Sequence, residues 1–164
     1  MLGRSLQAEA ARAAMVSTRP ELTAEFQTGY DALRSDLATW DANAARVFAG
    51  LNDANIVFSH PVYQYLARRY DLGGQTVIWE PDKTIGADEL RVLGRFAGAE
   101  GQRNILIWES EPLPGNRAAV ATQGFESVVF DPLGKRPESG DYLTGMDANV
   151  ERLLSLKLKG STDD

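Results

Sequence analysis

The stretch that decides the fold is Asn55-Ile-Val-Phe-Ser-His-Pro-Val-Tyr-Gln-Tyr-Leu-Ala-Arg-Arg-Tyr-Asp-Leu72. It begins with a short apolar run, residues 56–58, which is typical of a buried strand. The run ends in Ser59 and His60, the only histidine of the chain. Pro61 suits the first turn of a helix. The apolar residues of that helix recur at helical spacing: Val62, Tyr65, Leu66 and Tyr70. The stretch therefore predicts a strand that passes directly into a helix, with the imidazole at the junction.

Three further runs have the same form, each four residues long and each followed by an acidic residue. They are residues 76–79 before Glu80, residues 105–108 before Glu109, and residues 127–130 before Asp131. The intervening segments 61–71, 87–98 and 114–123 are each long enough for a helix. Strands that alternate with helices indicate right-handed βαβ units and a parallel sheet. We predict the α/β class, with a four-stranded parallel sheet flanked by helices.

The four strand ends define one candidate site. In open parallel sheets, ligands bind beyond the carboxyl ends of the strands. His60, Glu80, Glu109 and Asp131 each follow a predicted strand, so all four are expected at that edge.

Further helices are predicted before and after these strands in the sequence. Alanine-rich residues 4–17 form the first helix, with Leu6, Ala10, Ala13 and Ala14 on its apolar stripe. Pro20 begins a much longer amphipathic helix that ends near Leu51. The last helix runs from about residue 142 to residue 158, and its inward residues are expected to be Met146, Val150, Leu153, Leu154 and Leu158. The chain then divides into a short N-terminal helix (1–19), a long linking helix (20–51) and an α/β lobe (52–164).

Composition excludes several classes of protein. The 164 residues are 43% hydrophobic, lack cysteine and carry a net charge of −6. No apolar run approaches the ~20 residues of a membrane span, and the first ten residues lack the apolar core of a signal peptide. The negative charge argues against nucleic acid as the main partner. The lack of cysteine excludes disulfides and metal sites built from thiolates.

An imidazole and carboxylates at one sheet edge match the donor set of zinc or manganese. Structural alternatives stay open. For a single histidine such as His60, a structural role is slightly favoured over metal ligation. For Glu80 and Glu109, capping a helix, forming a salt bridge or fixing a loop is favoured over direct metal ligation. Trp79 and Trp108 are expected in the core. A hydrolase-like enzyme that uses His60 and a carboxylate is a further alternative, but no Gly-rich phosphate loop or nucleophile elbow follows any strand.

The motifs resemble those of the substrate-binding proteins of zinc and manganese ABC importers. The resemblance is carried by residues 60–72, by the apolar strand that ends in Glu109, and by Phe-Asp-Pro-Leu-Gly at residues 130–134. The closing helix is similar too, with its Tyr, Met, Asn and Leu pattern between Tyr142 and Leu153. Asp71 stands where the family usually has a small residue.

The resemblance implies two lobes joined by one rigid helix, with a metal ion in the cleft between them. His60 would be the third ligand and Asp131 the fourth, and a histidine at this position favours zinc over manganese. Glu80 and Glu109 would then support the ligands or fix loops. The protein would not be an enzyme; it would deliver metal to the membrane subunits of an ABC permease, in the periplasm or at the cell surface.

The chain departs from the family in one large respect, because it has no N-terminal lobe to supply the first two ligands. We therefore expect a C-terminal part of such a protein, which alone binds zinc weakly because it lacks a four-donor site. A stand-alone remnant or partner-binding domain without tight metal binding is the alternative function.

Overall fold

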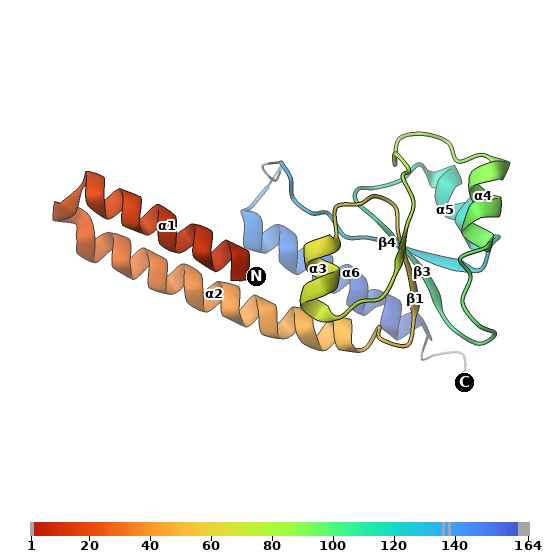
Figure 1. The fold of residues 1–164 in the computed structure, drawn as a ribbon, viewed down its shortest axis with the longest axis horizontal. Coiled ribbons are helices and arrows are strands. Elements are labelled where there is room, and N and C mark those ends of the chain that lie inside the picture. Colours follow the sequence, from red (N-terminus) through yellow and green to blue (C-terminus); the bar gives the residue numbers. More distant parts are fainter. Residues whose placement is uncertain (1, 136, 138, 161–164) are drawn as a thin grey trace. The chain divides into compact units, whose positions relative to one another are not determined.

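The structure, a computed structural model, describes residues 2–135, 137 and 139–160. The helices and strands follow one another as shown in Figure 1. Their order is α1 (Leu2–Thr18), the 3-10 helix η1 (Pro20–Leu22), α2 (Thr23–Ala49), β1 (Asn55–Phe58), α3 (Gln64–Tyr70), β2 (Gln75–Thr76), α4 (Ala87–Gly94), β3 (Asn104–Trp108), α5 (Pro114–Ala121), β4 (Phe125–Val129) and α6 (Tyr142–Gly160). None of the helices in the described ranges is long and apolar enough to cross a membrane.

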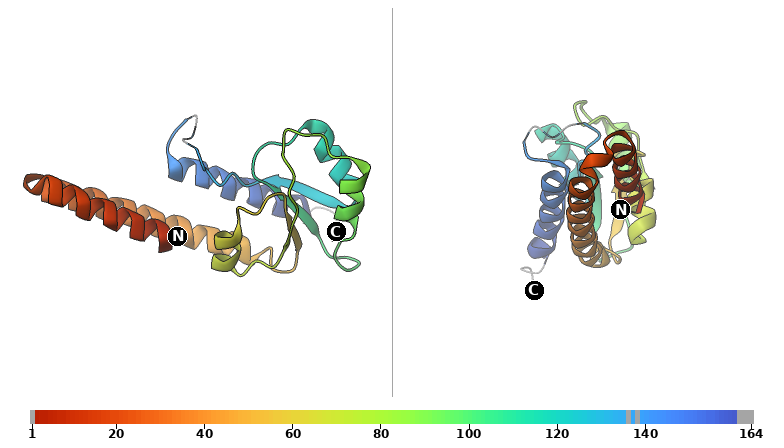
Figure 2. Two further views of the ribbon diagram at one scale, coloured as in Figure 1. Left: turned by 45° about the horizontal axis from the view of Figure 1, so that its top comes forward. Right: turned by 90° about the vertical axis from the view of Figure 1, so that its left-hand side faces the viewer.

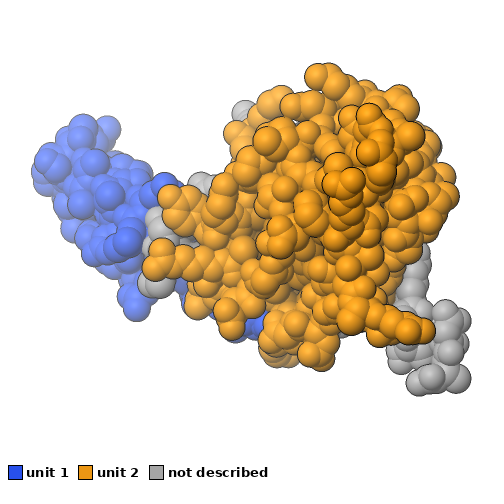
Figure 3. Space-filling model, turned by 45° about the vertical axis from the view of Figure 1, so that its right-hand side comes forward, with its two compact units in different colours: residues 1–45 blue, residues 46–164 orange. Residues whose placement is uncertain are grey.

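The chain forms two compact units, residues 1–45 and residues 46–164 (Figure 3). The first unit contains α1 and most of α2, and within it the guanidinium of Arg12 lies 5.4 Å from the centre of the Tyr30 ring. The three-part division at residues 19 and 51 remains a prediction.

The predicted apolar stripe of α1 is exposed. Leu6 is 65% exposed, and the three alanines of the stripe are exposed as well. A single methyl group contributes little burial energy, so alanines define the inner face of a helix poorly. The half-buried side chains of α1 lie on another face: Ser5, Ala8, Arg12 and Val16.

The predicted amphipathic character of α2 is confirmed in its second half. Leu37, Trp40, Ala44 and Val47 are all buried, while Leu33 is 40% exposed. Phe48, next to Val47, is fully buried as well.

The second unit is built on a four-stranded sheet, which confirms the predicted α/β fold class. The strand order is β2-β1-β3-β4, and every pair is parallel. Phe58 lies opposite Ile107, and Trp108 lies opposite Val129. This register places the ends of β1, β3 and β4 side by side.

The second strand is shorter than predicted. β2 contains only Gln75 and Thr76, although the N–H groups of Val77 and Trp79 still bond to the carbonyls of Phe58 and Ser59 at 2.9 Å. Ile78 is 75% exposed, because this segment lies at the edge of the sheet.

Helices cover both faces of the sheet, with α3 and α6 on one face and α4 and α5 on the other (Figures 1 and 2). One core cluster joins strand residues Val57, Leu106 and Trp108 to Leu93 of α4 and Val120 of α5. On the opposite face, aromatic rings form the contacts: Phe58 stacks on Tyr63, and Phe130 meets both Tyr63 and Phe48.

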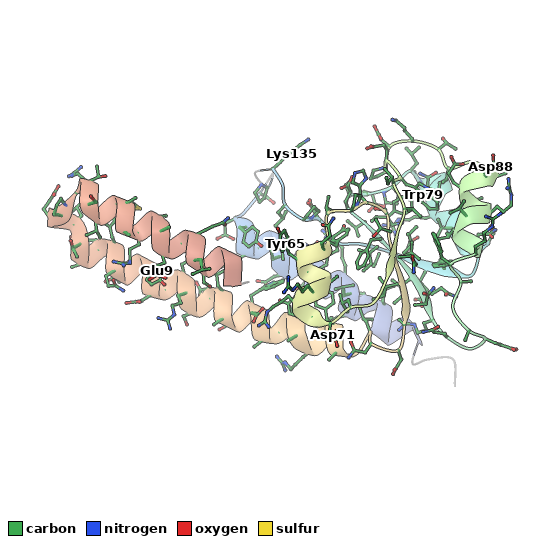
Figure 4. All side chains as sticks on the ribbon, in the orientation of Figure 1. Glu9, Tyr65, Asp71, Trp79, Asp88 and Lys135 are labelled. Atoms are coloured by element: carbon green, nitrogen blue, oxygen red, sulfur yellow. The ribbon has the colours of Figure 1, made fainter. Side chains whose placement is uncertain are left out.

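The helix after β1 begins later than predicted. Pro61 is not in its first turn, because the Val62 N–H bonds to the His60 carbonyl in a tight turn and α3 starts at Gln64. The turn directs Tyr63 into the core, where it is 2% exposed, and Tyr65 is 88% exposed. Figure 4 labels Tyr65 beside α3. Helical spacing of apolar residues therefore does not identify the buried tyrosine of this segment.

The last helix follows the prediction with one exchange. Met146, Val150 and Leu153 are buried, as predicted, but Leu154 is 42% exposed and Leu156 is buried instead. A period of 3.6 residues brings residue 156, not residue 154, onto the face of residues 146, 149 and 153. Leu158 lies outside the residues whose side chains are described.

Asp71 ends α3 in a left-handed conformation, with φ 52° and ψ 43°, and its N–H bonds to the Ala67 carbonyl. Glycine adopts this conformation without the steric cost of a Cβ. We expect Asp71→Gly to raise the free energy of unfolding by about 0.5–1 kcal/mol in urea denaturation. Asp71→Ala removes the same carboxylate but keeps the Cβ, so it should give no gain. An equal gain from both variants would contradict the conformational explanation.

Candidate functional site

His60 lies just beyond the carboxyl end of β1, two residues past Phe58. Its position is fixed through Ser59, which is completely buried. Ser59 donates its N–H to the Ile107 carbonyl, and its own carbonyl accepts the Trp79 N–H, both at 2.9 Å. Ser59 therefore ties the base of the His60 segment to both neighbouring strands.

Glu109 approaches His60 from the end of β3. Its Oε1 lies 3.9 Å from Nδ1 of His60, and the two side chains are each about one quarter exposed, at 23% and 24%. The Glu109 N–H also donates to the Ser59 hydroxyl at 3.3 Å. Nδ1 itself is buried and makes no hydrogen bond among the described residues, so the exposed part of the imidazole lies on its other atoms.

Asp131 follows β4 and is half-buried. One carboxylate oxygen, Oδ1, accepts the N–H of Leu133 at 2.7 Å. The N–H of Asp131 donates to Oδ1 of Asn149 in α6 at 2.8 Å, and the Asp131 carbonyl accepts from Nδ2 of the same side chain at 2.7 Å. These bonds tie the main chain of Asp131 to α6.

Tyr63 is a buried phenol on the chain that follows His60. Its hydroxyl donates to the Phe130 carbonyl at 2.6 Å, directly before Asp131. Burial raises the pKa of the Tyr63 hydroxyl, and the nearby Glu109 and Asp131 carboxylates raise it further. The phenol therefore remains a neutral hydrogen-bond donor, and both carboxylates lie within electrostatic reach of it.

The four predicted site residues are thus not all close to one another. The structure brings His60 to Glu109, and Asp131 directly follows Phe130, whose carbonyl the Tyr63 hydroxyl binds. Glu80 is exposed in the loop beyond β2, where its carbonyl accepts the Lys83 N–H. Among the described residues, no three histidine or acidic side chains are grouped closely enough to hold a metal ion by themselves.

Three supporting residues were missed from the sequence: Ser59, Tyr63 and Asn149. Asn149 did carry a signal, because it is a polar residue on the apolar face that Met146 and Leu153 define. A buried side-chain amide needs hydrogen-bond partners. The role of Tyr63 had no local signal, since its partner Phe130 is 67 residues away in sequence.

Comparisons with known proteins agree with the resemblance. A family model described as "Zinc-uptake complex component A periplasmic" (ZnuA) matches residues 4–155. Among curated proteins, none is similar enough to match this chain.

Solved structures share the fold at low sequence identity. The zinc-bound ZnuA-like domain of AdcA from Streptococcus pneumoniae is 20% identical, with a TM-score of 0.74 over 93% of this chain and 58% of that one. The metal-dependent lipoprotein YcdH from Bacillus subtilis is 17% identical, with a TM-score of 0.75 over 88% of this chain and 57% of that one. A crystal structure of ZnuA is 19% identical, with a TM-score of 0.69 over 92% and 57%. The chain therefore spans just over half the length of these relatives.

The raised pKa of Tyr63 predicts a loss of stability at alkaline pH. Above about pH 10 the unfolded chain releases the phenolic proton while the folded chain keeps it, so stability falls as pH rises. This single group contributes a slope of up to about 1.4 kcal/mol per pH unit. Tyr63→Phe should therefore show a shallower alkaline decline than the native chain in urea unfolding at pH 8, 10 and 11.

The same variant should lose about 1 kcal/mol or more at pH 8, because the buried Phe130 carbonyl loses its donor. The variant Tyr65→Phe, at an exposed tyrosine, is the matched control. It should change neither the free energy of unfolding at pH 8 nor its decline at alkaline pH. If Tyr63→Phe lost stability above pH 10 as steeply as the native chain does, Tyr63 would not be a source of the alkaline decline.

Proposed function

Because the chain belongs to the periplasmic zinc-uptake complex component A family, we propose that it forms part of a metal-binding substrate-binding protein that serves an ABC importer. In this proposal His60 and Asp131 are two of the metal donors. The observation that carries it is the shared edge of the sheet, where the parallel register aligns the ends of β1, β3 and β4. The family consists of transport proteins, so no reaction is assigned to His60.

The metal donor of His60 is proposed to be Nε2. Nδ1 is buried and lies towards Glu109, and a carboxylate beside one ring nitrogen fixes the proton there and leaves the other nitrogen for the metal. The 3.9 Å separation of Nδ1 and Oε1 is too long for a hydrogen bond. Metal binding would shorten it by drawing the ring and the carboxylate into line.

We propose zinc as the preferred ion. Imidazole nitrogen suits zinc, while manganese favours an all-oxygen environment more strongly. The zinc-bound AdcA domain shares the fold, which supports this choice. Manganese is the alternative ion.

Two donors leave the other positions of a tetrahedral zinc ion to water or to groups outside these residues. The chain spans 58% of the AdcA domain, and we propose that it corresponds to the C-terminal part. Residues 52–164 would be the metal-binding lobe, residues 20–51 the linking helix, and residues 1–19 a remnant of the other lobe. Such a part binds zinc weakly alone; in the whole protein it would face the permease in the periplasm or at the cell surface.

The lone histidine makes the test direct, because only one imidazole contributes to a ¹⁵N NMR spectrum of histidine-labelled protein. Titration with zinc should shift Nε2 strongly and leave Nδ1 protonated. Asp131→Asn should weaken zinc binding by about tenfold or more. Titration with manganese should give weaker binding than titration with zinc.

Two variants serve as controls for the zinc titration. His60→Gln removes the imidazole, so its binding is followed by isothermal calorimetry and should be abolished. Glu80→Gln removes an exposed acid at the same edge and should bind as the native chain does. Native affinity in His60→Gln would refute the proposed site.

A further inference from the structure

Asn149 is completely buried, and the bonds of its side chain to described residues go to the Asp131 main chain and to two residues of its own helix. Its Oδ1 accepts the Asp131 N–H at 2.8 Å, and its Nδ2 donates to the Asp131 carbonyl at 2.7 Å. Arg152, one turn further along α6, donates to the same Oδ1 at 2.6 Å. An amide that pairs with both main-chain groups of one residue fixes the peptide planes on both sides of it. Asn149 thus sets where the Asp131 side chain emerges.

The loop that Asn149 holds contains an unfavourable backbone conformation. Leu133 has φ 53°, in the left-handed region that bulky residues rarely adopt. Its N–H donates to Oδ1 of Asp131, and a Cβ added at Gly145 of α6 would lie 2.7 Å from its Cδ1. Such a conformation persists only where its surroundings hold it. The close packing on α6 and the Asn149 amide supply that hold.

We propose that Asn149 is the positioning residue of the metal donor Asp131, an inference that rests on the proposed metal-binding function. One carboxylate oxygen of Asp131 is occupied by the Leu133 N–H, which leaves the other oxygen for the metal. With the main chain held on both sides, that oxygen is already in place before the ion arrives. A preorganised donor loses less freedom on binding, so it binds more tightly.

The test compares zinc affinities of the full chain by calorimetry and by the His60 ¹⁵N signals. Asn149→Ala should weaken zinc binding by roughly 10-fold to 100-fold, the range found for groups that orient ligands. Leu153→Ala is the matched control, because Leu153 is equally buried on the same helix. It should lower the melting temperature but leave the affinity within about twofold, since it supports folding rather than the donor.

A double-mutant cycle separates positioning from general destabilisation. In the Asp131→Asn background, Asn149→Ala should cause little further loss, because the donor it positions is already removed. If Asn149→Ala weakens binding equally in both backgrounds, the inference is overturned.

A near-isosteric variant covers the case in which Asn149→Ala does not fold. Asn149→Asp keeps the acceptor for the Asp131 N–H but loses the donor to the carbonyl, so it too should bind zinc less tightly. Native zinc affinity in either folded Asn149 variant would overturn the inference. Native affinity in Asp131→Asn would instead refute Asp131 as a donor, which is a failure of the proposed function.

Discussion

The parallel pairing of β1, β3 and β4 is the constraint on which the candidate site depends. Phe58 lies beside Ile107, and Trp108 lies beside Val129. The ladder continues past the strand ends, because the N–H groups of Ser59 and Phe130 bond to the carbonyls of Ile107 and Trp108 at 2.9 Å. His60, Glu109 and Asp131 follow these paired positions, so a shift of one residue in either pairing would turn their side chains to the other face.

A second layer of buried polar contacts holds the ends of the strands in place. Ser59 binds the Glu109 N–H, Tyr63 binds the Phe130 carbonyl, and Asn149 binds the main chain of Asp131. Each of these three side chains is buried, where an unpaired polar group would be costly. The same contacts that make this edge stable therefore also determine where His60, Glu109 and Asp131 lie.

The sequence was enough to predict the sheet, because strand and helix periodicities are local patterns. It also placed His60, Glu109 and Asp131 at one edge, since that follows from parallel topology alone. The sequence could not predict the start of α3, because the turn at His60 depends on Tyr63 reaching a carbonyl 67 residues away. Leu154 was misplaced for a simpler reason: the 3.6-residue period of the helix brings residue 156, and not residue 154, onto the buried face.

The most direct test is a crystal of this chain grown with zinc and measured by anomalous diffraction at the zinc absorption edge. The account predicts an anomalous peak about 2.0–2.2 Å from both Nε2 of His60 and a carboxylate oxygen of Asp131. A zinc ion bound elsewhere on the chain, with His60 and Asp131 both free of metal, would contradict it.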